Sequence, residues 1–473
     1  MKNRTLKISI LCTSAFLLSG VLSSCNKTTN DLNTLNIVCL NKGYGDTWIK
    51  NLVTEWERQN PDYKVHLEAT SSASTIIQRN INSKNNTDDL YISVGNDWKT
   101  YAASGKFLSL DDLILEEVDG VQIKNKVNPE YLDSIYYQDA NDETHVYRLP
   151  WTSGVGGIYY NAKMFSDNNW SIPTTYDELI ALINTIKTAN IPVAGSETDT
   201  VKPFVYTGLN TDYFDYAVFT WWSQLAGKSA IKEFLSYENA DVFDYTNKNS
   251  AYSKLYEATK LWNNIFNDKS NYVEGSAGKT NHQAQQNFLN GYAAMMFNSD
   301  WLYNEMINYM DDKTLPESFD LKIMKTPVAP NAVEPNSSYI VGEDQYIAIP
   351  KSTQKADLAK SFIKLMVSDY SMQNFLDNAY GLMAYSWDSS EYTSTNNYVN
   401  SLLEYRTSLE STYTNYSSSP LYLSGVVDIW STSAARPFKG LLDGTIASVE
   451  AAFETIKRNA NDNWSTWLRQ VGL

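Results

Sequence analysis

The stretch Leu149-Pro-Trp-Thr-Ser-Gly-Val-Gly-Gly-Ile-Tyr-Tyr-Asn-Ala-Lys-Met-Phe165 decides how this chain is organised. Pro150 fixes φ and lacks an amide proton, so regular structure before it must end there. Three glycines follow within four residues and let the chain bend or approach another backbone closely. Ile158-Tyr-Tyr160 is then a β-prone strand. This order predicts a hinge between two lobes with an aromatic-lined cleft, although a loop entering a core strand would show the same pattern.

Composition places the chain among globular proteins with an acidic surface. It has 473 residues, of which 43% are hydrophobic and 19% charged, and its net charge is −16. A chain of this length exceeds one compact core, so we expect at least two lobes. The negative charge disfavours nucleic acid or anionic lipid as partners. The 13 Trp and 33 Tyr exceed what a core needs and suit a surface that stacks on a ligand.

The amino terminus reads as a targeting segment. Three basic residues precede the apolar run Ile8–Leu18, which is too short to span a membrane in the mature protein. Leu22-Ser-Ser-Cys25 then resembles a bacterial lipobox, in which Cys25 is lipidated, and a plain secretory signal is the alternative. Cys12 would be removed with the signal and Cys39 lies in an apolar strand, so no disulfide is expected. The three histidines are too scattered to predict a metal site, and no cofactor is expected.

Strands and helices alternate over the first hundred residues. Asn36–Leu40 predicts a strand, a helix with apolar residues at fourfold spacing follows, and Leu90–Val94 predicts a further strand. Such alternation predicts a parallel sheet covered by helices. Ligands of these sheets sit beyond the carboxyl ends of the strands, which places the loop at Tyr44 and the pair Asp97 and Trp98 on one rim.

Similar signals recur after the glycines. Thr175-Tyr-Asp-Glu178 is a capping box that opens a helix. Ala293–Asn298 predicts a strand, and Asp300 is expected to cap a helix beginning at Trp301. Gln345–Ile349 predicts another buried strand. The alternation therefore continues through the second half of the chain.

Several blocks together resemble the sugar-type solute-binding proteins of ABC importers, the class that contains maltose-binding protein. Pro150–Lys163, with Pro173–Glu178, is similar to that class's first crossover and the helix after it. Phe288-Leu-Asn-Gly-Tyr-Ala-Ala-Met-Met-Phe-Asn-Ser-Asp-Trp301 is similar to its second signature, whose tryptophan faces the ligand. Ile347–Pro350, with Ala359–Ile363, resembles the return to the first lobe. The order and spacing of the blocks make the resemblance specific.

Some positions depart from that class. Ser299 stands where the class usually has glycine, so the turn before Trp301 need not match. Gly154 stands where maltose-type members carry an acidic residue, so maltose itself is not implied. The loop Gly43-Tyr-Gly45 is similar to a subset of Gram-positive members and does not name a substrate.

The resemblance implies an α/β, two-lobed periplasmic-binding-protein-like fold, each lobe a mostly parallel sheet flanked by helices, with the ligand cleft between the lobes. We expect three crossings between the lobes, near Pro150–Gly157, Asn336–Asp344 and Tyr380–Trp387. The expected organisation is a signal peptide at 1–24, the lipidated cysteine and tether at 25–35, a first lobe of 36–149 plus 342–383, and a second lobe of 155–335 plus 388–473.

Sugars present apolar C–H faces and rings of hydroxyls, so their sites combine aromatic rings with Asp, Asn and Arg side chains. Trp301 begins a helix after a strand, and Trp430 resembles the class's late ligand tryptophan. The other ligand-binding candidates are Tyr44, Asp97, Trp98, Trp151, Trp222, Asp344 and Arg436.

Several of these candidates have an equally plain structural reading. Tyr44 and Trp151 suit the core as well as the cleft wall. The expected helix Asp212–Leu225 carries two adjacent tryptophans that diverge by about 100°, so at most one of them faces the cleft. For Asp344 and Arg436, a solvated surface charge is the simpler reading.

The pattern predicts a carbohydrate-binding component of an ABC importer, held outside the cell membrane by its lipid, acting as a monomer and handing its ligand to the permease without catalysis. A secreted glycoside hydrolase would need two carboxylates about 5–10 Å apart across a sugar cleft, and the spacing of the acidic residues does not indicate such a pair. A peptide or other small solute on the same fold stays open, because fold alone does not decide function.

Overall fold

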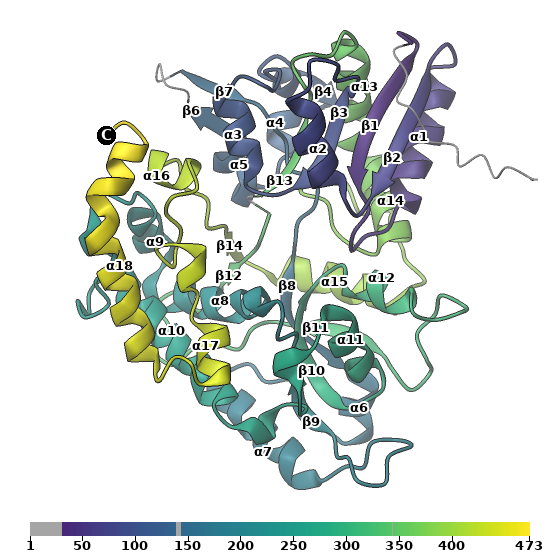
Figure 1. The fold of residues 1–473 in the computed structure, drawn as a ribbon. Coiled ribbons are helices and arrows are strands. Elements are labelled where there is room, and N and C mark those ends of the chain that lie inside the picture. Colours follow the sequence, from purple (N-terminus) through teal and green to yellow (C-terminus); the bar gives the residue numbers. More distant parts are fainter. Residues whose placement is uncertain (1–30, 139–142, 343) are drawn as a thin grey trace, which may run out of the picture.

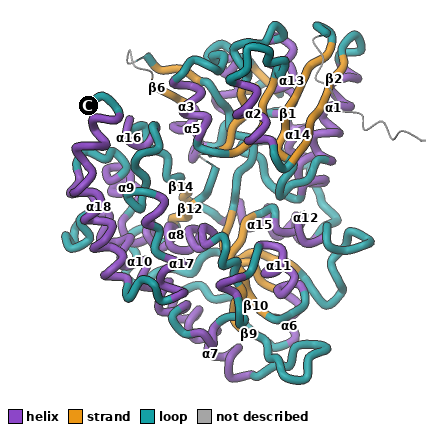
Figure 2. Tube along the Cα trace, in the orientation of Figure 1, coloured by secondary structure: helices purple, strands orange, loops and turns teal. Residues whose placement is uncertain are grey.

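The chain forms two lobes stacked one above the other in the computed structural model, which describes residues 31–138, 143–342 and 344–473 (Figure 1). Each lobe has its own sheet, and segments of the chain pass between the sheets at the centre of the molecule (Figure 2). The expected signal peptide and Cys25 lie outside the described residues. The predicted two-lobed α/β fold is confirmed.

The first lobe is built on a four-stranded sheet in the order β13-β3-β1-β2. Strand β1 pairs in parallel with β2 and β3, while β13 is antiparallel to β3. The only free cysteine among the described residues, Cys39, is buried in β1, and its burial raises the pKa of the thiol. The strands are β1 (Thr34–Leu40), β2 (Lys64–Thr70), β3 (Leu90–Val94) and β13 (Gln345–Ala348).

The helices that pack against this sheet do so with buried apolar residues. In α1, the predicted fourfold spacing is confirmed, since Trp48, Leu52 and Trp56 are all buried. The helices of this lobe are α1 (Thr47–Gln59), α2 (Ala73–Ile81), α3 (Asp97–Ala103), α4 (Ile123–Lys126), α5 (Pro129–Ile135), α13 (Ala356–Met366) and α14 (Asp369–Ala379), with two small hairpins formed by β4 (Glu117–Val118) and β5 (Val121–Gln122) and by β6 (Tyr136–Gln138) and β7 (Thr144–Val146).

The second lobe is built on a sheet in the order β11-β8-β10-β9. Here the expectation of a mostly parallel sheet is wrong. Strand β8 runs antiparallel to both of its neighbours, β10 and β11, and only β9 and β10 are parallel. The reason is that β8 enters the lobe from the crossing, whereas β10 runs back toward it. The strands are β8 (Gly156–Asn161), β9 (Lys202–Val205), β10 (Ala293–Ser299) and β11 (Leu321–Met324).

The helices of the second lobe surround this sheet. On one side of it α8, α10 and the long α18 pack in layers and enlarge the lobe (Figure 1). The predicted capping box of α7 is confirmed, with both bonds between Thr175 and Glu178 present. Among the described residues, no helix is long and apolar enough to cross a membrane. The helices are α6 (Ala162–Asp167), α7 (Tyr176–Ala189), α8 (Asp215–Ala226), α9 (Lys228–Phe234), α10 (Ala251–Phe266), α11 (Asn281–Leu289), α12 (Leu302–Ile307), α15 (Asn397–Ser408), α16 (Pro420–Leu423), α17 (Phe438–Asp443) and α18 (Val449–Gln470).

The segments that pass between the lobes are tied to each other by single bridges. Leu149 bridges to Ile347, and Thr152 bridges to Met383. Beside them, the parallel pair β12 (Ser337–Tyr339) and β14 (Ser411–Tyr413) lies between the two sheets. A Cβ added at Gly156 would overlap the ring of Tyr216, so glycine is required where β8 meets α8.

Candidate functional site

A cavity of about 470 Å³ lies between the lobes, and we call it the aromatic cavity. The first lobe contributes the loops next to β3 and β13, and the second lobe contributes the rest. Its lining residues are Asn96, Asn210, Asp212, Tyr213, Asp215, Tyr216, Phe219, Trp301, Tyr339, Val341, Asp344, Asn415, Tyr422, Asp428, Ile429, Trp430, Ser433 and Arg436. The structure therefore brings four predicted site residues together around this cavity. They are Trp301, Asp344, Trp430 and Arg436.

Trp301 and Trp430 both line the aromatic cavity, but they differ in how deeply their indole rings are buried. Trp301 is only half-buried, and its Nε1 donates to the hydroxyl of Tyr213 at 3.3 Å. Trp430 is 1% exposed and stacks on Phe219, with ring centroids 5.8 Å apart and planes 26° apart. Trp430 also meets Phe438 edge-on within the core of the second lobe. Trp430 is thus both core and cavity wall, whereas Trp301 belongs mainly to the cavity.

Arg436 is held at the cavity by two carboxylates rather than exposed as a free surface charge. Its Nη2 donates to Asp215 at 2.8 Å, and its Nη1 contacts Asp212. Asp215 begins α8, and Asp212 lies in the turn before it. A guanidinium fixed in this way presents its remaining N–H groups in a defined direction.

Two further carboxyls in the cavity are affected by burial. Burial raises the pKa of Asp428 to about 6, opposed by the amide of Trp430, which donates to Asp428 Oδ1 at 2.8 Å. Burial also raises the pKa of Asp344, opposed by the positive charge of Arg148. Both groups are acceptors for ligand hydroxyls when they are ionised.

Some polar atoms of the cavity residues are buried without a hydrogen-bond partner among the residues that the structure describes. Among them are Nε1 of Trp430, Nε of Arg436 and Oδ1 of Asn415. A buried donor or acceptor left unpaired costs about 1–3 kcal/mol, so such atoms are normally satisfied by water or by a ligand. Two donors and one acceptor suit a ligand that carries hydroxyls, because a hydroxyl both donates and accepts.

The structure places three of the predicted tryptophans inside the lobes. Trp98 and Trp151 are buried in the first lobe, where Arg148 lies over the ring of Trp98 at 4.4 Å and Trp151 stacks on Trp48 at 5.6 Å. Trp222 is buried in the second lobe, and its Nε1 donates to Ala251 O. Their positions at strand ends or on α8 are as expected, but each indole turns inward, where burial of a large apolar ring is favourable.

Tyr44 and Asp97 lie near the cavity without lining it. The hydroxyl of Tyr44 donates to Asp300 Oδ1 at 2.6 Å, and its ring meets Trp301 edge-on. Asp97 begins α3, and its Oδ2 accepts from the hydroxyl of Tyr101 at 2.7 Å.

The cavity residues from η2 (Thr211–Phe214) and α8 were not predicted, because an aromatic helix was expected here but only one of its tryptophans was assigned to the cleft. The run Asp212-Tyr-Phe-Asp-Tyr216 was the available signal, because it combines acidic and aromatic side chains before a helix. Asp428 was missed although it stands two residues before Trp430. The sequence does not reveal that these segments face each other.

The expectation that Asp300 caps α12 is wrong. Trp301 occupies the N-cap position without a capping hydrogen bond. The carboxylate of Asp300 instead accepts from Tyr44 and from the amide of Leu382, both distant in sequence. Tertiary partners thus replace the local cap.

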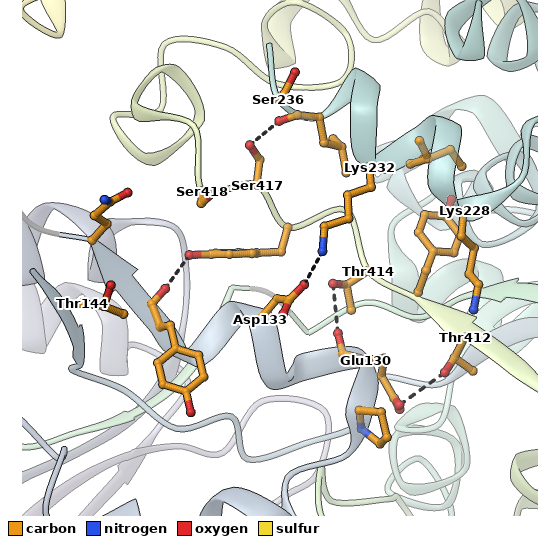
Figure 3. Close-up of a pocket in the computed structure, with 17 residues that line it drawn as sticks. Glu130, Asp133, Thr144, Lys228, Lys232, Ser236, Thr412, Thr414, Ser417 and Ser418 are labelled. Atoms are coloured by element: carbon orange, nitrogen blue, oxygen red, sulfur yellow. Dashed lines mark hydrogen bonds and ion pairs between the residues drawn. The ribbon is translucent and has the colours of Figure 1, made fainter. Parts of the chain in front are cut away.

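A second, larger cavity of about 700 Å³, which we call the polar cavity, lies between α5 and β6 of the first lobe and α9 and residues 412–418 of the second (Figure 3). Several of its polar groups are paired with each other across the lobes. Lys232 reaches Asp133 at 2.9 Å, and Thr412 donates to Glu130, as the dashed lines in Figure 3 show. Among the described residues, none that line it has a buried side-chain N or O without a partner.

Two α/β lobes joined by several crossings, with a cavity between them that is lined by aromatic rings and charged side chains, define a two-lobed solute-binding fold. The chain belongs to the bacterial extracellular solute-binding protein family, whose model matches residues 42–373. Members of this family are receptors rather than enzymes, which agrees with the prediction of binding without catalysis.

Relatives and solved structures are similar over most of the chain. A multiple sugar-binding protein of Streptococcus mutans is 23% identical over 369 residues, covering 76% of this chain and 78% of the relative. The GacH receptor of Streptomyces glaucescens, solved unliganded and with acarbose, is 15% identical with a TM-score of 0.66, covering 92% of this chain and 98% of that one. An ABC substrate-binding protein of Listeria monocytogenes in complex with cycloalternan is 16% identical with a TM-score of 0.61, covering 91% and 99%.

Proposed function

We propose that this protein is the lipid-anchored binding component of an ABC importer, which captures a carbohydrate between its lobes and delivers it to the membrane permease as a monomer. The observation that carries the proposal is the aromatic cavity, where Trp301 and Trp430 lie beside buried polar atoms that have no protein partner. Indole rings match the apolar faces of a sugar, and the unpaired donors and acceptor match its hydroxyls.

The relatives support a carbohydrate over another small solute. The Streptococcus mutans relative is a multiple sugar-binding protein, the GacH receptor was solved with acarbose as well as unliganded, and the Listeria monocytogenes protein was solved with cycloalternan. Within the site, we assign ligand contact to Trp301, Asp344, Trp430 and Arg436 and add Asp428 to them. Tyr44, Asp97, Trp98, Trp151 and Trp222 would act behind this layer, through packing.

Capture involves closure of the lobes about the crossings near Pro150–Gly157, Asn336–Asp344 and Tyr380–Trp387. Short segments of this kind absorb dihedral changes without disturbing a core. The lobe boundaries are those given by the sequence, 36–149 plus 342–383 and 155–335 plus 388–473. Small-angle scattering would show a smaller radius of gyration with ligand, and an equal radius under saturating ligand would argue for a rigid site.

Cys25 is the proposed lipid-bearing residue, because it follows an apolar signal segment in a lipobox-like sequence. Two acyl chains give stable anchoring, whereas one alone is marginal. Cys25→Ala would release the protein from the membrane or leave the signal uncleaved. Unchanged fractionation and processing would contradict the anchor.

The direct test of sugar binding is a thermal-shift panel of mono- and oligosaccharides on the purified protein. A ligand at a hundred times its Kd adds about 2.7 kcal/mol to stability, which gives a clear shift. The matched control is Trp301→Ala, for which the shift by the same sugar is expected to shrink. If no sugar moves the melting curve while a peptide does, the carbohydrate assignment fails.

Incubation of the protein with the best-binding oligosaccharide separates capture from hydrolysis. We expect the oligosaccharide to be recovered intact by chromatography. Release of shorter products at a rate that scales with protein concentration would favour a glycoside-processing enzyme.

A further inference from the structure

Asp300 connects parts of the chain that come from both lobes. Its side chain is fully buried. Oδ1 accepts from the hydroxyl of Tyr44 at 2.6 Å, and Oδ2 accepts from the amide of Leu382 at 2.9 Å. Tyr44 belongs to the loop after β1 in the first lobe, and Leu382 belongs to the third crossing. One carboxylate on the second lobe thus binds the first lobe and a crossing at once.

The backbone of Asp300 makes two further long-range bonds. Its amide donates to Val155 O at 3.0 Å, in the first crossing. Its carbonyl accepts from the hydroxyl of Tyr398 at 2.9 Å, on α15. The residue just before Trp301 is therefore fixed by two of the three crossings.

The partner of Asp300 is itself closely fitted. The ring of Tyr44 meets Trp301 and Trp151 edge-on, with centroids 6.0 and 5.7 Å away. A Cβ added at Gly381 would lie 2.5 Å from Cε1 of Tyr44, so only glycine lets the third crossing approach this ring. In addition, Nδ2 of Asn304 on α12 donates to Gly43 O at 2.7 Å.

The chemistry of the carboxyl favours strong hydrogen bonds. Burial raises the pKa of Asp300 to about 6, while the bonds from Tyr44 and Leu382 oppose that rise. The group is therefore mainly ionised at neutral pH. Hydrogen bonds to an ionised acceptor are about twice as strong as those between neutral groups, and this site is shielded from water.

We propose that Asp300 is a positioning residue that sets the relative placement of the two lobes, by joining the Tyr44 loop to the first and third crossings directly beside Trp301. A change in lobe angle must stretch or break these bonds. The placement of Trp301 at the cavity is thereby coupled to the crossings. The proposal concerns lobe geometry without any sugar, so it can fail or succeed independently of the proposed function.

The test is small-angle scattering of the ligand-free protein carrying Tyr44→Phe, which removes one hydroxyl and leaves the ring in place. We expect a larger radius of gyration than in the wild type. The matched control is Tyr176→Phe, which removes a hydroxyl that donates to Leu261 O at 2.9 Å within the second lobe alone. Both variants should lose melting temperature to a similar extent, but only Tyr44→Phe should change the radius.

Hydrogen exchange at Leu382 provides a second measurement. In Asp300→Asn a neutral carboxamide replaces the ionised carboxylate that accepts from the amide of Leu382. We expect hydrogen exchange at that backbone amide to accelerate at least tenfold. In Tyr44→Phe the Oδ2 acceptor stays, so protection at Leu382 should fall less. An unchanged or smaller radius for Tyr44→Phe, or an equal increase for Tyr176→Phe, would overturn the proposal, even if Asp300→Asn fails to fold.

Discussion

The two cavities between the lobes differ in a way that volume does not predict. The polar cavity is the larger, at about 700 Å³ against about 470 Å³ for the aromatic cavity. In the polar cavity, lysine, glutamate, aspartate and threonine side chains pair across the lobes. In the aromatic cavity, Trp430, Arg436 and Asn415 keep polar atoms with no partner in the described chain. Unpaired buried groups cost free energy, so the smaller cavity has the stronger reason to hold a ligand.

The contrast also separates two ways of joining the lobes. Around the polar cavity, contacts such as that of Lys232 with Asp133 lie largely in solvent, with side chains 81% and 77% exposed. Exposed pairs of this kind contribute little to stability. Beside the aromatic cavity, the contact between Tyr44 and Asp300 is buried. The strength of an interlobe contact therefore depends on its burial more than on its formal charge.

The largest effect is expected for Trp430→Ala. Because this indole packs on Phe219 and Phe438 as well as lining the cavity, its loss should lower the free energy of unfolding by about 3–5 kcal/mol. Urea denaturation measures this change, with Tyr416→Phe at the polar cavity as the mild control. An unfolding curve for Trp430→Ala close to that of the wild type would show that Trp430 does not stabilise the core.

Trp301→Ala should act mainly on binding. Truncating an aromatic anchor commonly costs 2 kcal/mol or more, which is about thirtyfold in affinity. Because Trp301 is only half-buried, its stability loss should be smaller than that of Trp430→Ala. Calorimetric titration with the best sugar of the thermal-shift panel measures the affinity. Unchanged affinity beside a large drop in melting temperature would make Trp301 a core residue and undo the distinction between the cavities.

A pH dependence should mark the aromatic cavity. The pKa of Asp428 is raised by burial to about 6, above its ordinary value near 3.8. Between these values the folded protein binds a proton that the unfolded chain does not, so stability rises as pH falls through 6. From pH 7.5 to 5.5 the gain is about 1 kcal/mol.

The matched variant for this effect is Asp428→Asn, which cannot titrate. Melting curves across the same pH range should show a weaker rise for the variant than for the wild type. The pKa of Asp300 is raised to a similar value, so Asp300 titrates in both proteins. The variant should therefore still gain some stability as the pH falls. Identical pH profiles would show that Asp428 does not titrate in this window.

The smallest effect is expected for Lys232→Ala at the polar cavity. Its partner Asp133 is exposed, so the pair is screened by solvent, and neither residue touches the aromatic cavity. Sugar affinity should stay equal to that of the wild type in calorimetric titration. A severalfold loss of affinity would show that the two cavities act together in ligand capture.

The sequence was most informative where a signal is local. Strand β3 has the bounds that Leu90–Val94 predicts, and the capping box of Thr175 and Glu178 forms as expected. Both depend on neighbours within a few residues. The two-lobed fold could also be predicted, because the resemblance to the family depends on the order of the sequence blocks along the chain.

The direction in which a side chain points could not be predicted. Trp98 and Trp301 both follow the end of a strand, yet the first turns into its lobe and the second toward the cavity. Asp300 was expected to cap a helix, but its carboxylate accepts hydrogen bonds from Tyr44 and Leu382, which are distant in sequence. The antiparallel pairing of β8 was missed for the same reason, because it depends on how the chain returns from the crossing.

The buried thiol of Cys39 makes the chain suited to site-directed labelling. From residue 31 onward it is the only cysteine, and its burial, with the raised pKa of the thiol, protects it from maleimides. Cysteines introduced at exposed positions 133 and 232, which face each other across the polar cavity, would be the reactive pair (Figure 3). Spin labels or fluorophores attached there in a protein that begins at residue 31 can report the distance between the lobes in a single molecule, with no need to remove Cys39 first.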